Sequence, residues 1–233
     1  MQTELRKKQR RREILAGLTI ILAVASYITA LLLDLNFVSP YATLQEDLSY
    51  LSNHQSNLQI SVWAWLGTSL ITFISIPPFI LLFHKRMKVF QYVNAFWLLG
   101  ASAGFLMMGI TGIDLYQQLA GGLLSDLQES DEEIWIKLLG LFQDEQFYRY
   151  VGSSFVGLFA IGLGLTRFKL RRVPIVSMVL LLICGPTMIF FNWHDPEHLI
   201  RTGAMAGIMI GVTIFSVRII NKGLDEVPKQ TTP

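Results

Sequence analysis

Charged residues are scarce in this sequence. Of its 233 residues, 15% are Asp, Glu, Lys or Arg, 52% are hydrophobic, and the mean hydropathy is +0.46. A soluble domain carries about 25% charged residues, so this composition argues against a soluble globular enzyme. Intrinsic disorder requires low hydrophobicity, so the same composition argues against a disordered chain.

Cysteine is almost absent. Cys184 is the single cysteine, which excludes an internal disulfide and any zinc cluster built from cysteines. The sequence also lacks Gly-x-Ser-x-Gly and a glycine-rich phosphate loop followed by lysine, the motifs of serine hydrolases and P-loop ATPases. The absence of these motifs argues against both nucleophilic catalysis and ATP hydrolysis.

Long apolar runs are what the sequence has instead. A helix that crosses the hydrocarbon core of a membrane needs about 20 mostly apolar residues. Six stretches meet or approach that length, and their only charged residues are arginines close to helix ends. We predict an all-α, polytopic membrane protein whose single domain, 1–223, is a six-helix bundle, with a polar tail at 224–233. The predicted transmembrane helices are 14–33, 58–83, 89–113, 148–165, 174–191 and 199–220.

The distribution of charge predicts how these helices are oriented. Of the 19 Lys and Arg residues, all but Lys137, Arg149 and Arg201 lie at the N-terminus, in the turns after the second and fourth helices, or near the C-terminus. Short segments rich in Lys and Arg stay in the cytoplasm. We therefore predict a multi-pass protein of the cell (inner or plasma) membrane with both termini in the cytoplasm.

Two other interpretations of the basic N-terminus are a cleavable signal and a nucleic-acid-binding segment. Together with apolar residues 14–22 and Ala23-Val24-Ala25, the N-terminus has the form of a cleavable secretory signal. The apolar run continues through Leu33, which favours a retained helix. A basic run can also bind nucleic acid, but directly before a membrane helix it normally serves as a topology anchor. We predict no nucleic-acid partner.

The connections on the outer side are long enough to contain further helices. In 44–51, Leu44, Leu48 and Leu51 recur with helical spacing, as in an amphipathic helix at the membrane interface. Ser130 and Glu133 resemble a capping box before the apolar segment 134–141. We expect two short interfacial helices, which either cap the outer mouth of the bundle or only seal its helix ends.

Small residues mark the expected contacts between helices. There is little hydrophobic driving force between membrane helices, so glycines indicate close packing. Gly203, Gly207 and Gly211 are spaced four residues apart on the last helix. We expect another helix or a second subunit against this face. The expected partners are therefore membrane lipids and either a second copy of the chain or another membrane protein.

A polar stripe runs along the second helix. Ser61, Thr68 and Thr72 share one helical face, which we expect to turn inward, and Pro77-Pro78 should kink the helix. The stripe belongs either to a bent structural helix or to the ligand pathway of a transporter. No charged residue lies near the midplane, which disfavours an ion-coupled pump.

Three further polar residues belong to the candidate ligand pathway. Asn94 is the deepest strongly polar side chain, and we expect it to bond a neighbouring helix. Arg149 and Arg201 are cations on the outer side, against the positive-inside pattern. Each either pairs with an acid or binds an anion such as a lipid phosphate. The candidate acids are Asp114, Glu145 and Asp195.

One cluster could hold a metal ion. His194, Asp195 and His198 lie close together between the fifth and sixth helices, and His54 in the first outer loop could complete the set. Imidazole and carboxylate groups bind zinc and other divalent ions. The spacing is not that of His-Glu-x-x-His, and Asp195 followed by Pro196 equally fits the capped start of a helix. Both readings stay open.

Three short segments carry a resemblance to a known family. They are Asp47-Leu48-Ser49-Tyr50-Leu51 before the second helix, Phe83-His84-Lys85-Arg86 after it, and Leu170-Arg171-Arg172-Val173-Pro174 at the fifth. On these segments and its layout, most of the chain resembles an uncharacterised bacterial family of six-helix integral membrane proteins, a domain of unknown function. The resemblance implies the fold and a bacterial inner membrane, and it implies no activity.

Three classes of function follow from these features. The first is a non-enzymatic scaffold, sensor or accessory subunit, which should have a closed interior. The second is a small-molecule or lipid transporter, which should have a cavity reaching the polar stripe. The third is a metal-dependent enzyme at the outer face, which should bring His54 within about 5 Å of His194 or His198. No residue is assigned a catalytic role.

The charge distribution predicts the result of a fusion experiment. A fluorescent protein fused after Lys222 should fluoresce, and alkaline phosphatase fused there should be inactive, because the positive-inside pattern keeps that end in the cytoplasm. The same two reporters inserted after Gly122 should behave in the opposite way. Active phosphatase at the C-terminal fusion would contradict the predicted orientation.

Overall fold

The described part of the chain is helical throughout. The computed structural model describes residues 2–35, 53–83, 88–120, 132–168, 173–194 and 199–222. It contains six long helices, each long and apolar enough to cross a membrane, which confirms the predicted all-α fold class. They are α1 (Gln2–Leu35), α3 (Gln55–Phe83), α4 (Lys88–Ala120), α6 (Glu132–Leu165), α7 (Ile175–His194) and α8 (Leu199–Lys222), with a 3₁₀ turn, η1 (Thr166–Phe168), after α6.

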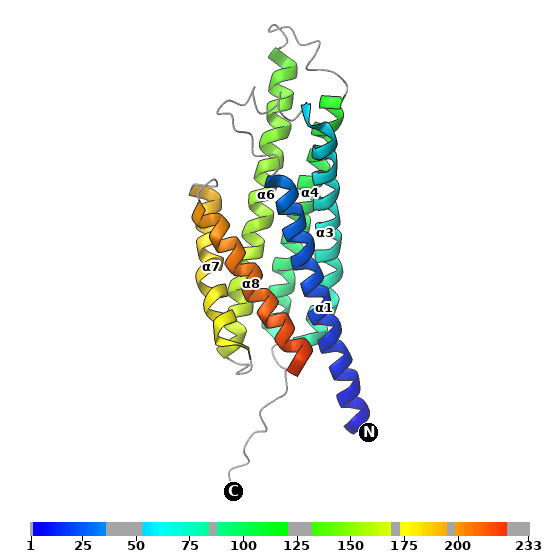
Figure 1. Cartoon of the computed structure of the whole chain (residues 1–233), viewed down its shortest axis with the longest axis vertical. Coiled ribbons are helices and arrows are strands. Elements are labelled where there is room, and N and C mark those ends of the chain that lie inside the picture. Colours follow the sequence, from blue (N-terminus) through cyan, green and yellow to red (C-terminus); the bar gives the residue numbers. More distant parts are fainter. Residues whose placement is uncertain are drawn as a thin grey trace.

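The six helices form a closed ring. Each helix packs against the next in the order α1, α3, α4, α6, α7, α8, and α8 returns to α1. Figure 1 shows that α1 begins and α8 ends at the same end of the bundle, which we call the terminal end. The opposite end is the distal end. The short connections between α3 and α4 and between α7 and α8 require these pairs to run antiparallel, and helices consecutive in sequence are neighbours throughout the ring.

Contacts between α1 and α8 close the ring at the terminal end. Arg10 donates from Nη1 to the carbonyl oxygen of Ile219, at 2.8 Å, and also donates to the carbonyl of Ile220. These are last-turn carbonyls, which have no partner within their own helix, and a cation is favourable there. Glu13, one turn further along α1, is 4% exposed and accepts a hydrogen bond from Gln9 at 3.1 Å.

Helices α1, α4 and α6 extend well beyond the predicted spans. α1 begins at Gln2, because the Arg, Lys, Gln and Glu residues before the apolar run are good helix formers. α6 joins the expected interfacial helix and the fourth span in one element. α3 continues through Pro77 and Pro78, so these prolines do not end it. The segment 44–51 and Ser130 lie outside the described residues.

At the distal end, α3, α4 and α6 extend beyond the ends of α1, α7 and α8 (Figure 1). Their ends pack around Leu115, Leu119 and Leu138, which are almost fully buried. We call this part the distal projection. It occupies the place where a small outer cap was expected, and it consists of continuations of three long helices.

Aromatic side chains fill the ring at the middle of the bundle. Tyr27 of α1, Trp65 of α3 and Phe105 of α4 are 1–3% exposed, and their ring centroids are 5.0–5.6 Å apart. The Tyr27 hydroxyl lies 3.4 Å from Oγ of Ser153 on α6. Four helices therefore meet at this aromatic cluster, which we define as Tyr27, Trp65 and Phe105.

Glycines allow α6 to approach both of its neighbours. A Cβ on Gly104 of α4 would lie 2.6 Å from Cα of Gly152. On the other side of α6, a Cβ on Gly157 would lie 3.0 Å from the carbonyl oxygen of Gly185 on α7. Close backbone approach of this kind maximises van der Waals contact between membrane helices.

The three glycines expected to form one contact face on α8 do not all contact another helix. Gly207 and Gly211 pack against α7, where a Cβ would meet Cys184 and Leu181 respectively. Gly203 is exposed, and a Cβ there would meet nothing within 4 Å. Two of the three glycines thus serve a contact within the chain, and only Gly203 offers a bare surface.

A methyl group added at Gly104 and one added at Gly203 should have opposite effects on the stability of the protein. Gly104→Ala should destabilise the protein by about 1–3 kcal/mol, because the backbone of α6 would have to move. Gly203→Ala, the matched control, should be neutral or stabilising by up to about 1 kcal/mol, because alanine favours the helix. Thermal unfolding of both variants in detergent measures the difference. Equal melting temperatures would contradict the close α4–α6 contact.

Candidate functional site

Polar side chains from three helices meet near the distal ends of α7 and α8. We call this cluster the distal junction. Most of its members lie where the apolar spans end, so the groups that need water or hydrogen-bond partners gather at one level. The residues are Glu145, Arg149, Tyr150 and Ser154 of α6, Asn192, Trp193 and His194 of α7, and Arg201 of α8.

Asn192 is the centre of the distal junction. Its side chain is 1% exposed, and its Nδ2 donates to Oγ of Ser154 at 3.1 Å and to the carbonyl of Tyr150 at 3.4 Å. Its Oδ1 accepts a hydrogen bond of 2.7 Å from Nε of Arg201. One amide thereby joins α6, α7 and α8. Asn192 was given no role from the sequence, because two of its partners, Tyr150 and Ser154, lie on a different helix far earlier in the chain.

Arg149 and Arg201 have different partners. Arg149 donates to Glu145 at 2.8 Å, one helical turn away on α6, so of its two expected alternatives the structure contains the pairing with an acid. Arg201 donates to the side-chain amide oxygen of Asn192, and its guanidinium lies 5.5 Å from the centroid of the Tyr150 ring. Such a cation–π contact is favourable, and more so where water is excluded. Asp195, the candidate acid for Arg201, lies outside the described residues, and Asp114 is exposed on α4.

His194 and Trp193 complete the cluster. The His194 ring is exposed and stacks on Phe190, with centroids 4.1 Å apart, and its Nδ1 lies 3.0 Å from the Phe190 carbonyl oxygen. Because that oxygen can only accept, Nδ1 is the protonated nitrogen in this contact, which leaves Nε2 for other partners. Trp193 donates from Nε1 to Oγ of Ser154 at 3.1 Å.

The predicted metal ligands are only partly described. Asp195 and His198 lie outside the described residues. His54 precedes α3, where its carbonyl accepts hydrogen bonds from the N–H groups of Asn57 and Leu58. Figure 1 places the start of α3 in the distal projection, away from the end of α7 that carries His194. Within the described ranges, no three His, Cys, Asp or Glu residues are grouped so that they could hold a metal ion.

The polar stripe of α3 turns inward, as expected. Ser61, Thr68 and Thr72 are all buried. The hydroxyl of Thr68 bonds the carbonyl of Ala64 at 2.9 Å, and Ser75 bonds Thr72 in the same way at 2.6 Å. Hydroxyls used in this manner are satisfied within their own helix.

A neighbouring serine pair joins α3 to α4. Ser69 donates to the carbonyl of Ser102 at 2.8 Å, and Ser102 donates back to the carbonyl of Ser69 at 3.0 Å. This pair was not predicted from the sequence. Ser69 is not on the face of the stripe, and nothing local identifies Ser102 as its partner.

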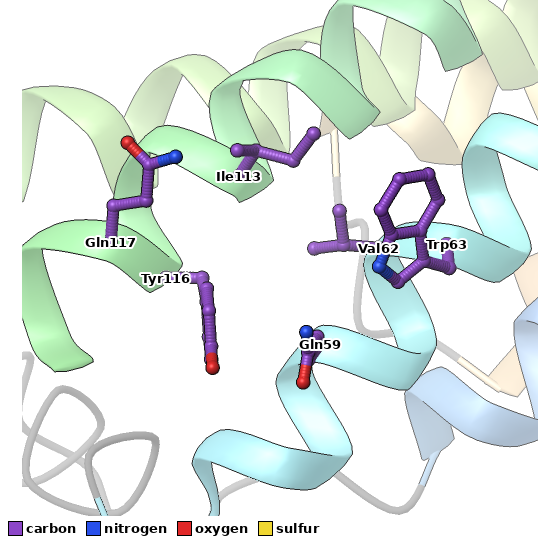
Figure 2. Close-up of a pocket in the computed structure, with 6 residues that line it drawn as sticks. All are labelled: Gln59, Val62, Trp63, Ile113, Tyr116 and Gln117. Carbon is purple, nitrogen blue, oxygen red and sulfur yellow. The ribbon is translucent and has the colours of Figure 1, made fainter.

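A shallow groove lies between α3 and α4 in the distal projection. Figure 2 shows its six lining residues, and its volume is about 160 Å³. None of the six side chains is charged. They are Gln59, Val62, Trp63, Ile113, Tyr116 and Gln117.

Asn94 is buried on α4 near the terminal end. Its Oδ1 rests against Gly162 of α6, at a place where any Cβ would collide with it. Asn94 therefore contacts a neighbouring helix, but its Oδ1 does not form the expected hydrogen bond, since it has no conventional donor among the described residues.

The distal junction predicts that Asn192 is important for stability. Asn192→Ala removes three hydrogen bonds, one of them to a charged group, and should cost about 2–4 kcal/mol. At about 2–4 °C per kcal/mol, the melting temperature should fall by several degrees. Thr187→Ala on the same helix is the control, because Thr187 bonds only the Ile183 carbonyl of its own helix. Similar shifts for both variants would contradict the role of Asn192.

Comparison with known proteins adds no further constraint. No family model, curated protein or solved structure matches this chain. The resemblance to a bacterial six-helix family therefore stays a prediction. What the chain's own residues establish is an integral membrane protein with six membrane-spanning helices in one bundle.

Proposed function

We propose that this protein is a non-enzymatic component of the cell membrane, a scaffold, sensor or accessory subunit of a membrane complex. The observation that carries the proposal is the aromatic cluster of Tyr27, Trp65 and Phe105, which fills the centre of the ring beside the polar stripe. Three large side chains that pack against one another leave no room for a solute at that level.

The hydroxyl groups of α3 and α4 support the same proposal. A transport site needs hydrogen-bonding groups that are available to a ligand. The hydroxyls of Thr68 and Ser75 bond their own helix, and those of Ser69 and Ser102 bond each other's backbone. These groups hold helices in place.

A scaffold or accessory subunit also needs a surface that meets a partner. On the distal projection, Trp63 and Ile136 are each 61% exposed. Large apolar side chains at a protein surface are favoured sites of protein contact. We propose that the distal projection meets the partner subunit, while the outward faces of the ring contact lipid.

The proposed orientation follows from the charges at the terminal end. Arg10 and Arg167 lie at this end, on α1 and η1. We propose that this end faces the cytoplasm of a bacterium and that the distal projection faces outward. Anionic lipid headgroups of the cytoplasmic leaflet would favour that arrangement.

Labelling of introduced cysteines tests whether the interior is closed. In a Cys184→Ala background, Thr72→Cys should react with a membrane-impermeant maleimide only at background level from either side of the membrane, because Thr72 is buried. Ser56→Cys, exposed at the start of α3, is the positive control and should react fully from one side. Rapid labelling of Thr72→Cys would contradict a closed bundle and favour the transporter.

A further inference from the structure

Two buried amides on α4 have unused hydrogen-bonding groups. Gln91 and Asn94 are three residues apart on α4, so they share one helical face, and each is 1% exposed. Neither Oε1 nor Nε2 of Gln91 has a hydrogen-bond partner among the described residues, and the same holds for Oδ1 of Asn94. Three polar atoms of two neighbouring side chains are thus buried together without partners.

Such an arrangement is unfavourable unless something else bonds these atoms. Burying an amide without a partner costs free energy in any protein interior. Inside a membrane, bulk water cannot supply the missing bonds. A methionine at position 91 would fill nearly the same space without this cost. The presence of glutamine in the sequence therefore requires a physical reason.

Gly162 accounts for part of the arrangement. Its missing side chain makes room on α6 for Oδ1 of Asn94, and its Cα–H groups can form only weak hydrogen bonds. This contact aligns α4 with α6, but it leaves the stronger bonding capacity of both amides unused. Gln91 in particular retains a donor and an acceptor.

We propose that Gln91 and Asn94 bind an ordered water molecule between α4 and α6, near the terminal end of the ring. A water molecule can donate to Oε1 of Gln91 and Oδ1 of Asn94 and can accept from Nε2 of Gln91. Buried waters typically make about three such bonds. Side chains at i and i+3 have Cβ atoms about 5–6 Å apart, a separation that one bridging water spans.

The chemistry of the site favours water over other ligands. Both side chains are neutral and offer donors as well as acceptors, so no ion of either sign is selected by charge. Lipid is excluded because the two side chains are almost fully buried. The inferred site is separate from the aromatic cluster, where a single buried group, Nε1 of Trp65, also has no hydrogen-bond partner among the described residues. At Gln91 and Asn94, three such atoms lie on one helical face.

The sign of a stability change distinguishes bound water from an unpaired amide. Gln91→Met should lower the melting temperature by roughly 2–4 °C if the amide bonds water, since a net hydrogen-bonding contribution is lost. It should raise the melting temperature if the amide is unpaired, because an unfavourable buried group is removed. Gln117→Met on the same helix is the matched control. Its side chain is exposed, so we expect little change.

A second measurement uses the unaltered protein and does not depend on the folding of a variant. In lipid nanodiscs, magnetisation transfer in NMR should connect the side-chain amide protons of Gln91 with water, and the resonance is assigned by its loss in Gln91→Met. A water contact together with a lowered melting temperature would support the proposal. An unchanged or raised melting temperature, or no transfer from water to Gln91, would overturn it.

Discussion

Inside a lipid bilayer, every backbone N–H and C=O group must find its partner within the protein, and the rest of this structure depends on that constraint. Helices satisfy it within a single segment. Once the helices exist, burial of apolar surface gives little further drive, so their association relies on close contact. The glycine contacts of α6 with both neighbours, Gly104 with Gly152 and Gly157 with Gly185, are the consequence.

The helices are joined by different interactions at the two ends of the ring. At the terminal end, Arg10 bonds the last carbonyls of α8, so a cation closes the ring at the negative end of a helix dipole. At the distal junction, the neutral amide of Asn192 joins three helices and holds Arg201. Between these ends the aromatic cluster fills the interior. A bundle fastened at both ends and filled in the middle suits a structural role better than a conducting one.

Local pairings were predictable, and distant ones were not. The Arg149–Glu145 pair was one of the expected alternatives, and it forms because residues four apart on a helix are neighbours whatever the fold. Arg201 contacts Asn192 and Tyr150, and neither contact was expected from the sequence. Tyr150 lies on another helix, more than fifty residues earlier in the chain. Only the packing of α8 against α6 and α7 brings it within reach.

The sequence by itself determined the fold class and the approximate spans. The length of an apolar run and its lack of charge are local properties, and they decide whether a helix can cross the hydrocarbon core. The sequence also determined that the stripe of Ser61, Thr68 and Thr72 is buried, since a hydroxyl gains nothing from lipid. The tertiary structure decided the order of the ring and the division of the α8 glycines between a packed and a bare surface. It also decided that the ends of α3, α4 and α6 pack together as the distal projection. These depend on which surfaces fit together at van der Waals distance, and such complementarity has no signature within any single helix.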